Sequence, residues 1–153
     1  ATIVVFLLLF SGACTGSSTG GIKMARHLLV FKNIRSALLR LVHPGMITQI
    51  RINNQAISNQ QNLSGITFLI IYIILFLAGS IVLAITGLDP LTAISASASS
   101  LGNVGPGLGT IGPVHNFFHL SAIGKYICCL LMIIGRLEIY TFFILFTRSF
   151  WRI

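Results

Sequence analysis

An unbroken run of 24 uncharged residues, Leu63 to Thr86, constrains this chain more than any other feature. As a helix with a rise of about 1.5 Å per residue, it would extend about 36 Å, which is enough to cross the ~30 Å hydrocarbon core of a bilayer. A run of this length without a charge is typical of a transmembrane helix. We therefore predict a membrane span over residues 63–86.

The rest of the sequence also indicates a membrane protein. It contains two further apolar stretches, 2–11 and 121–147. The chain is 55% hydrophobic and only 8% charged, whereas soluble domains carry about 25% charged residues. This excludes an ordinary soluble enzyme, and it excludes a disordered chain, which needs low hydrophobicity. The chain starts at Ala1 inside an apolar run with no charged segment before it. We therefore expect no signal peptide, but a fragment whose missing N-terminal part begins this segment.

The distribution of basic residues predicts the orientation. The connection from Gly21 to Asn62 holds six of the ten Lys and Arg residues, and the tail adds Arg148 and Arg152, whereas residues 87–124 contain none. Because basic residues collect in cytoplasmic loops, we predict that residues 22–62 and the C-terminus are cytoplasmic and that 87–120 lie on the outer side. Topology then explains the net charge of +8, and we expect no binding to nucleic acid.

The segment 22–42 is predicted to be a helix that changes character along its length. The arc that carries Lys23, Arg26 and His27 in the first half is mostly apolar in the second half. We expect a kink or a change of environment near residues 31–33, as the helix leaves the bilayer. His43-Pro44-Gly45 should end the helix. Residues 43–62, rich in Gln and Asn, are predicted to form a polar cytoplasmic linker.

Between the last two spans lies a segment that is neither a span nor an ordinary loop. Asp89 can cap a helix and Pro90 suits the first turn, so a helix is predicted over 89–101, too short to cross a bilayer. Four glycines follow within residues 102–109. A half-length helix followed by a glycine-rich extended strand is the layout of a pore loop, because non-helical backbone at membrane depth must be buried or line a water-filled cavity.

Such a strand could bind a cation through its backbone. Glycine allows successive carbonyl groups to point inward and replace the water shell of an ion. The C-terminal end of the preceding helix, which carries the negative end of its dipole, would point toward that cation. The first residues of this strand are Gly102, Asn103, Val104 and Gly105. The alternative is a glycine-rich turn on the outer surface.

The ordered set of motifs resembles the Trk/Ktr potassium-uptake family, which is related to the plant HKT transporters. The motifs are GPGLG at 105–109, LVHP at 41–44 and GRLEIYTFFILFTRSFW at 135–151, in addition to the strand at 102–105. The resemblance is to the C-terminal portion of pore-forming, TrkH-type subunits, which contain four helix–pore-loop–helix units in one chain. It implies an all-α integral membrane protein in which residues 1–42 end the third unit and residues 63–153 form the fourth. It also implies that Gly102, Asn103, Val104 and Gly105 are filter residues whose backbone binds K⁺ as the metal ion.

A second glycine-rich stretch follows the first apolar segment. Gly16 and Gly21 have the spacing of a phosphate-binding P-loop, but Ile22 stands where that motif requires Lys. The small residues of 11–21 should instead interrupt the helix within the membrane. The resemblance implies that this stretch is an intramembrane gating loop below the filter; the alternative is a cytoplasmic turn of no special role. The residues concerned are Gly12, Gly16, Ser17, Ser18, Thr19, Gly20 and Gly21.

Arg136 lies near the middle of the predicted span 121–147. An Arg at this depth is costly, at about 2.5–3.5 kcal/mol on insertion scales, so it should face protein or water rather than lipid. Glu138, two positions away, lies on nearly the opposite helix face and is expected to be structural. The resemblance implies that Arg136 faces the pore beneath the filter; the alternative is an ion pair with another helix.

The function predicted from these observations is potassium uptake across the cell membrane through a filter of backbone carbonyls, gated by an intramembrane loop. With two acidic residues in the chain, little acid–base chemistry is available, so we expect neither an enzyme nor a cofactor, and K⁺ as the transported ion. The resemblance implies a multi-pass protein of the bacterial inner membrane that contacts lipid, forms a homodimer and binds a cytosolic nucleotide-binding subunit of the TrkA/KtrA kind. The alternative is a membrane-embedded scaffold or enzyme with glycine-rich packing turns.

Overall fold

The structure is a computed structural model that describes residues 2–10, 12, 20–43, 51–52, 55–137, 139–145 and 151. These residues are helical except for one antiparallel pair of two-residue strands, in which Arg51 is opposite Ala56, and the connecting turns. The expected all-helical class is therefore confirmed. The elements are α1 (Thr2–Phe10), α2 (Met24–Val42), β1 (Arg51–Ile52), β2 (Gln55–Ala56), α3 (Asn59–Ile85), α4 (Pro90–Gly102), the 3-10 turns η1 (Gly109–Ile111) and η2 (Phe117–His119), α5 (Ala122–Arg136) and α6 (Ile139–Leu145).

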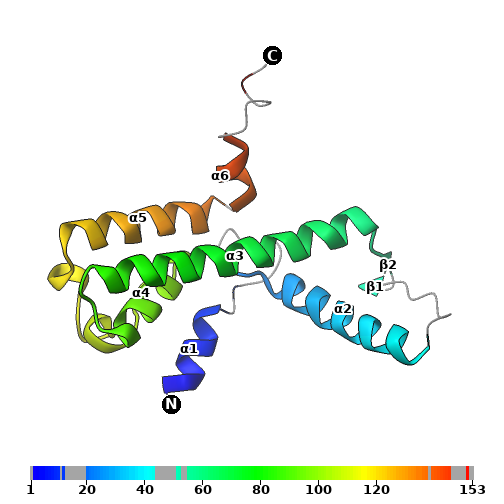
Figure 1. Cartoon of the computed structure of the whole chain (residues 1–153), viewed down its shortest axis with the longest axis horizontal. Coiled ribbons are helices and arrows are strands. Elements are labelled where there is room, and N and C mark those ends of the chain that lie inside the picture. Colours follow the sequence, from blue (N-terminus) through cyan, green and yellow to red (C-terminus); the bar gives the residue numbers. More distant parts are fainter. Residues whose placement is uncertain are drawn as a thin grey trace.

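The 27-residue helix α3 is the central element of the fold (Figure 1). A capping box begins it: the Ser58 hydroxyl accepts from the Gln61 backbone N–H at 3.2 Å, and the Gln61 side chain accepts from the Ser58 N–H at 3.4 Å. The helix therefore starts four residues before the apolar run at Leu63, and the predicted linker is shorter than 43–62. Among the described helices, α3 is the one that is long and apolar enough to cross a membrane by length and composition.

Helix α4 packs against both α3 and α5 and is almost entirely buried. Its residues Ala93, Ala96 and Ser97 have no exposed surface. Small side chains allow the neighbouring helices to approach closely, and the Ser97 hydroxyl donates to the Phe76 carbonyl of α3 at 2.9 Å. Asp89 holds the N-cap position, but its side chain makes no capping hydrogen bond, so the expected cap is absent.

The predicted single span 121–147 is two helices in the structure. Helix α5 ends at Arg136, Leu137 is its C-cap, and α6 begins at Ile139 and leaves at a steep angle (Figure 1). The break buries Ile139 to 1% exposure in a core cluster with Phe68 and Tyr72. It also brings the Tyr140 hydroxyl to the Ser64 carbonyl, to which it donates. The apolar pattern continues through the break and therefore does not reveal it.

Helix α2 runs without interruption through residues 31–33, where a kink or a change of environment was expected. Its packing does change along the helix. Leu29 is buried against α3, whereas Ile34, Leu38 and Leu41 are 54%, 59% and 79% exposed. The observed change is therefore one of packing within a continuous helix.

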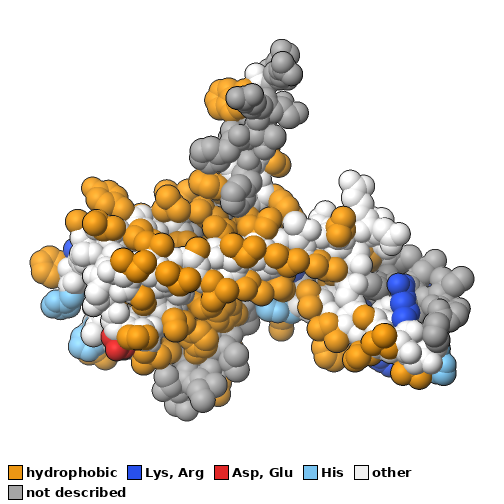
Figure 2. Space-filling model, in the orientation of Figure 1, with side chains coloured by type: hydrophobic (Ala, Val, Ile, Leu, Met, Phe, Trp, Pro, Cys, Tyr) orange, Lys and Arg blue, Asp and Glu red, His pale blue; other side chains and the backbone are white. Residues whose placement is uncertain are grey.

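Apolar and charged side chains occupy different parts of the surface. Figure 2 shows exposed hydrophobic side chains along the middle of the molecule, over α3 and α5. On this face, Lys and Arg gather at the end of the molecule where α2 lies, and the acidic side chain lies at the opposite end, near the start of α4. An apolar band between polar ends is the pattern of a membrane protein.

Candidate functional site: the end of the half-length helix

The predicted filter residues lie together where α4 ends. Gly102 is the buried last residue of the helix, and Asn103, Val104 and Gly105 follow in irregular, exposed backbone. Asn103 is the C-cap in the left-handed conformation, with φ 54°, and Gly105 has φ 106°. Left-handed backbone is disfavoured for residues with a Cβ, except that Asn tolerates it, so the residue types match the backbone at both positions.

Hydrogen bonds hold the segment from Val104 to Leu108 against α4. The Val104 N–H donates to the Ser99 carbonyl at 3.0 Å. Further along, the Ser95 hydroxyl accepts from the Leu108 N–H at 3.0 Å and donates to the Leu108 carbonyl at 3.1 Å. The segment therefore has a defined path against the helix although it has no regular secondary structure.

The end of the predicted gating loop contacts the start of the predicted filter. A Cβ placed on Gly20 would lie 2.7 Å from the Asn103 Nδ2 and 3.2 Å from the Gly102 carbonyl oxygen. The backbone of Gly20 is therefore in close contact with these two predicted filter residues. Gly21 is buried beside it. At the other end of the loop, the Gly12 N–H donates to the Ile22 carbonyl at 3.0 Å. Gly16, Ser17, Ser18 and Thr19 lie outside the described residues.

Helix α5 contacts the same point through Gly135, which the sequence reasoning did not single out. A Cβ on Gly135 would overlap the Leu101 carbonyl oxygen and lie 2.8 Å from the Asn103 Nδ2. The Asn103 side chain also donates to the Met132 carbonyl at 3.1 Å. In the sequence, the signal for this contact is that Gly135 is an isolated glycine inside an apolar helix, a position at which a small residue often allows close packing.

Arg136 directly follows this contact as the last residue of α5, and its side chain is exposed in the described chain. The structure thus places it one residue from the contact between α5 and the filter. Glu138 lies outside the described residues, and its structural role stays a prediction.

A buried hydroxyl completes the surroundings of Gly102. Tyr72 of α3 is 1% exposed, and its hydroxyl has no hydrogen-bond partner among the described residues. The hydroxyl would lie 3.9 Å from a Cβ on Gly102, and the Leu9 carbonyl of α1 would lie 3.0 Å from that Cβ. The end of α4 is therefore enclosed by α1, α3, α5 and the end of the loop.

The chemistry available at this site is that of the backbone. Asp89, the acidic residue in the described part of the chain, lies at the opposite end of α4. In those same residues no group of three His, Cys, Asp or Glu side chains is placed to hold a metal ion. What the site offers a cation is carbonyl oxygens on exposed backbone and the negative end of a helix dipole.

The whole chain, residues 1–153, matches the family model described as "TrkH: Cation transport protein". It is 37% identical over 153 residues to the Trk system potassium uptake protein TrkI of Halomonas elongata, covering 99% of this chain and 31% of that protein. It is 36% identical to the Trk system potassium uptake protein TrkH of Escherichia coli K12, covering 94% of this chain and 29% of that protein. It thus spans about three tenths of the length of these relatives.

The structure also resembles a solved one. It superposes on the crystal structure of the potassium transporter TrkH from Vibrio parahaemolyticus with a TM-score of 0.87 at 35% sequence identity, covering 99% of this chain and 32% of that chain. The likeness therefore extends to sequence and fold over nearly all of the residues. On these matches, the chain belongs to the TrkH family of cation transport proteins, which are membrane proteins and not enzymes.

Proposed function

We propose that this chain contributes one filter strand and part of the gate to a protein that takes up potassium. The observation that carries the proposal is the half-length helix α4, which is buried among α3 and α5 and ends at the exposed backbone of 103–105. In a bilayer, such a helix stops partway across and directs its negative end at whatever occupies the space beyond it. The names of the relatives, Trk system potassium uptake proteins, agree with K⁺ as that ion.

In this proposal the carbonyl groups of Gly102, Asn103, Val104 and Gly105 replace part of the water shell of K⁺. The ion moves inward, assisted by the membrane potential by about 2.3 kcal/mol per charge per 100 mV. One strand cannot surround an ion, so the other strands come from further pore units. Residues 1–42 end a third unit and residues 63–153 form the fourth, and the transported ion is the only metal required.

Gating is assigned to the loop of residues 12–21. Two observations support this assignment: Gly20 lies close to Asn103 and Gly102, and Arg136 directly follows Gly135, which contacts Leu101 and Asn103. The backbone of the loop obstructs ion passage here, and a positive charge on Arg136 raises the energy of a cation below the filter. Movement of either group would open the path.

The proposed membrane, orientation and partners follow from the predicted topology and the family resemblance. We assign it to the bacterial inner membrane with its C-terminus in the cytoplasm, because basic residues dominate 22–62 and the tail. A homodimer that binds a cytosolic nucleotide-binding regulatory subunit is the assembly that the family resemblance implies. The competing function, a membrane scaffold or enzyme with packing turns, has no ion flux.

Gly105→Ser in the full-length transporter tests the filter. Gly105 has φ 106°, and a Cβ added there would have no atom within 4 Å, so the substitution strains the backbone without a clash. Such strain costs about 1–3 kcal/mol and should shift the carbonyl groups of the strand. We expect a lower K⁺ over Na⁺ permeability ratio in liposomes.

The matched control is Gly87→Ser in the turn between α3 and α4. Gly87 has φ 89° and equally open surroundings, so it carries the same kind of strain away from the filter. It should keep the wild-type permeability ratio. A Gly105→Ser protein with an unchanged ratio contradicts the filter assignment, and wild-type protein without K⁺ flux contradicts the transport function itself.

A further inference from the structure

Residues 104–110, which continue the predicted filter strand, run back along α4. Three of their backbone N–H groups donate to groups of that helix, at 3.0, 3.0 and 3.4 Å: Val104 to the Ser99 carbonyl, Leu108 to the Ser95 hydroxyl and Thr110 to the Thr92 hydroxyl. As the segment proceeds along the chain, its partners lie nearer and nearer to the N-terminal end of α4. The segment is therefore antiparallel to the helix and is attached to it at three points.

The three attachment points lie on one face of α4. Positions 92, 95 and 99 are three and four residues apart, which makes them neighbours on a helix surface, and all three residues are buried. At about 100° per residue, Ser97 lies about 200° from Ser95 around the helix. Its hydroxyl donates to the Phe76 carbonyl of α3 at 2.9 Å. One face of α4 thus holds residues 104–110, and the nearly opposite face contacts α3.

Ser95 makes the closest side-chain contact with this segment. Its Oγ accepts from the Leu108 N–H at 3.0 Å, and its own proton has two acceptors in reach, the Leu108 carbonyl at 3.1 Å and the Thr92 carbonyl at 3.2 Å. A hydroxyl has one proton and two lone pairs, so Ser95 holds the Leu108 N–H whichever carbonyl its proton faces. The two contacts of Thr110 with the Thr92 hydroxyl are longer, at 3.4 Å each.

The exposed backbone lies between the first two attachment points. Residues 103–106 are exposed, whereas Gly107 is buried, and a Cβ on Gly107 would lie 3.3 Å from the Ser95 Oγ. The exposed carbonyl groups are thus held at both ends, by the N–H groups of Val104 and Leu108. A filter of backbone carbonyls distinguishes ions by the size of the space and by the number and field strength of the carbonyl groups around the ion. Release of one end would therefore change the property that determines selectivity.

We propose that Ser95 is a positioning residue for ion selectivity. By holding the Leu108 N–H, its hydroxyl fixes one end of the exposed backbone and thereby the spacing of the carbonyl groups of Val104, Gly105 and Pro106. Ser95 acts through this backbone and does not contact the ion. The inference rests on the proposed transport function and extends its machinery to a side chain of α4.

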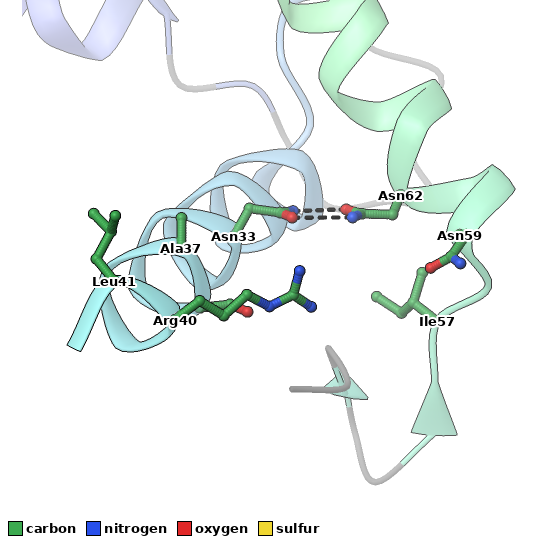
Figure 3. A pocket seen from close by; sticks show the side chains of 8 residues that line it. Asn33, Ala37, Arg40, Leu41, Ile57, Asn59 and Asn62 are labelled. Atoms are coloured by element: carbon green, nitrogen blue, oxygen red, sulfur yellow. Dashed lines mark hydrogen bonds between the residues drawn. The ribbon is translucent and has the colours of Figure 1, made fainter. Parts of the chain in front are cut away.

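Two other side-chain hydrogen bonds join helix to helix and supply controls. One is the bond from Ser97 to Phe76, on the nearly opposite face of α4. The other is a reciprocal pair of amides, in which Asn33 of α2 donates to Asn62 of α3 at 2.6 Å and accepts from it at 3.0 Å (Figure 3). Loss of either bond removes a contact between elements without touching residues 104–110.

The test measures the K⁺ over Na⁺ permeability ratio of the full-length transporter in liposomes, together with its thermal unfolding in detergent. Ser95→Ala should lower the ratio about five-fold, the factor by which the loss of a hydrogen bond of average strength changes an equilibrium. Ser97→Ala removes an equally buried hydroxyl from the same helix, and Asn33→Ala removes the amide pair. Both controls should keep the wild-type ratio, even where they lower the unfolding temperature as much as Ser95→Ala does.

A backbone variant removes the same hydrogen bond from its other side. Replacing Leu108 with its α-hydroxy acid analogue converts the N–H into an ester oxygen, which cannot donate to Ser95. This variant should lower the ratio by a similar factor, and combining it with Ser95→Ala should lower the ratio no further, because both changes remove one interaction. It also provides the test if Ser95→Ala does not fold.

The proposal is overturned by a wild-type ratio in Ser95→Ala or in the ester variant, or by an equal fall of the ratio in Ser97→Ala. These results leave the filter assignment standing if Gly105→Ser still lowers the ratio. Wild-type protein without K⁺ flux would reject the transport function, and the role of Ser95 with it.

Discussion

Replacing Gly135 with Ala tests whether the approach of α5 to the filter is needed for selectivity. The added methyl group would overlap the Leu101 carbonyl oxygen, lie 2.9 Å from its carbon and lie 2.8 Å from the Asn103 Nδ2. Ordinary contact begins at 3.4 Å, so the carbonyl carbon alone requires a shift of about 0.5 Å. Two of the three atoms belong to the backbone of α4 and cannot move by a change of rotamer.

The energetic cost follows from two opposing effects. Overpacking a close contact costs about 1–3 kcal/mol, and the backbone partner places this case near the upper end. The gain in helix propensity from Gly to Ala offsets about 0.5–1 kcal/mol of this cost. We therefore expect a net destabilisation of about 2 kcal/mol, together with lengthening of the hydrogen bond from Asn103 to the Met132 carbonyl.

The assay combines thermal unfolding of the full-length protein in detergent with K⁺ and Na⁺ flux in liposomes. Gly135→Ala should lower the unfolding temperature and reduce the K⁺ over Na⁺ ratio, because the Asn103 side chain connects α5 to the filter strand. The control is Gly65→Ala in α3, where a Cβ would meet only Leu29 side-chain atoms at 3.5 Å. It should be as stable as wild type or slightly more so. Equal stability and selectivity of the two variants refute the reasoning.

Two further predictions concern the proposed gate. Deleting residues 16–19 should raise K⁺ flux in the absence of any regulator, because a physical barrier is removed; wild-type uptake by a deletion variant that inserts normally shows that the loop is not a gate. Arg136→Ala should leave the protein folded and raise K⁺ flux, because a positive charge below the filter is removed, and Arg136→Lys should retain part of the wild-type behaviour because it keeps the charge. Normal flux per molecule with collapsed membrane abundance would instead assign Arg136 to the structural ion pair considered as the alternative.

The local elements of the fold could be predicted from the sequence because each has a short-range cause. The uncharged run from Leu63 requires a long apolar helix, and Pro90 followed by Ala and Ser favours a short, closely packed one. Positive φ at Gly105 is likewise a property of one residue type. The start of α3 at Asn59 was missed, although its capping box, Ser58 with Gln61, is visible in the sequence.

The candidate site could be predicted only in part. The glycine-rich strand at 102–105 is visible in the sequence, but its surroundings are not. Gly135 meets Leu101, and Gly20 meets Asn103, across separations in the chain over which no sequence pattern determines proximity. Their importance follows from close backbone approach, which a single sequence indicates only through the absence of a side chain.

Hydropathy, charge and residue type were enough to predict that this chain belongs in a membrane and that its basic residues cluster at 22–62. They were also enough to predict a half-length helix before a glycine-rich segment. Three features could not be predicted in this way: the last apolar segment breaks at Leu137, the Asn103 side chain donates to the Met132 carbonyl, and α2 runs unbroken through residues 31–33. These features depend on contacts between residues far apart in the chain. At the break, the burial of Ile139 against Phe68 and Tyr72 outweighs the local preference for a continuous helix.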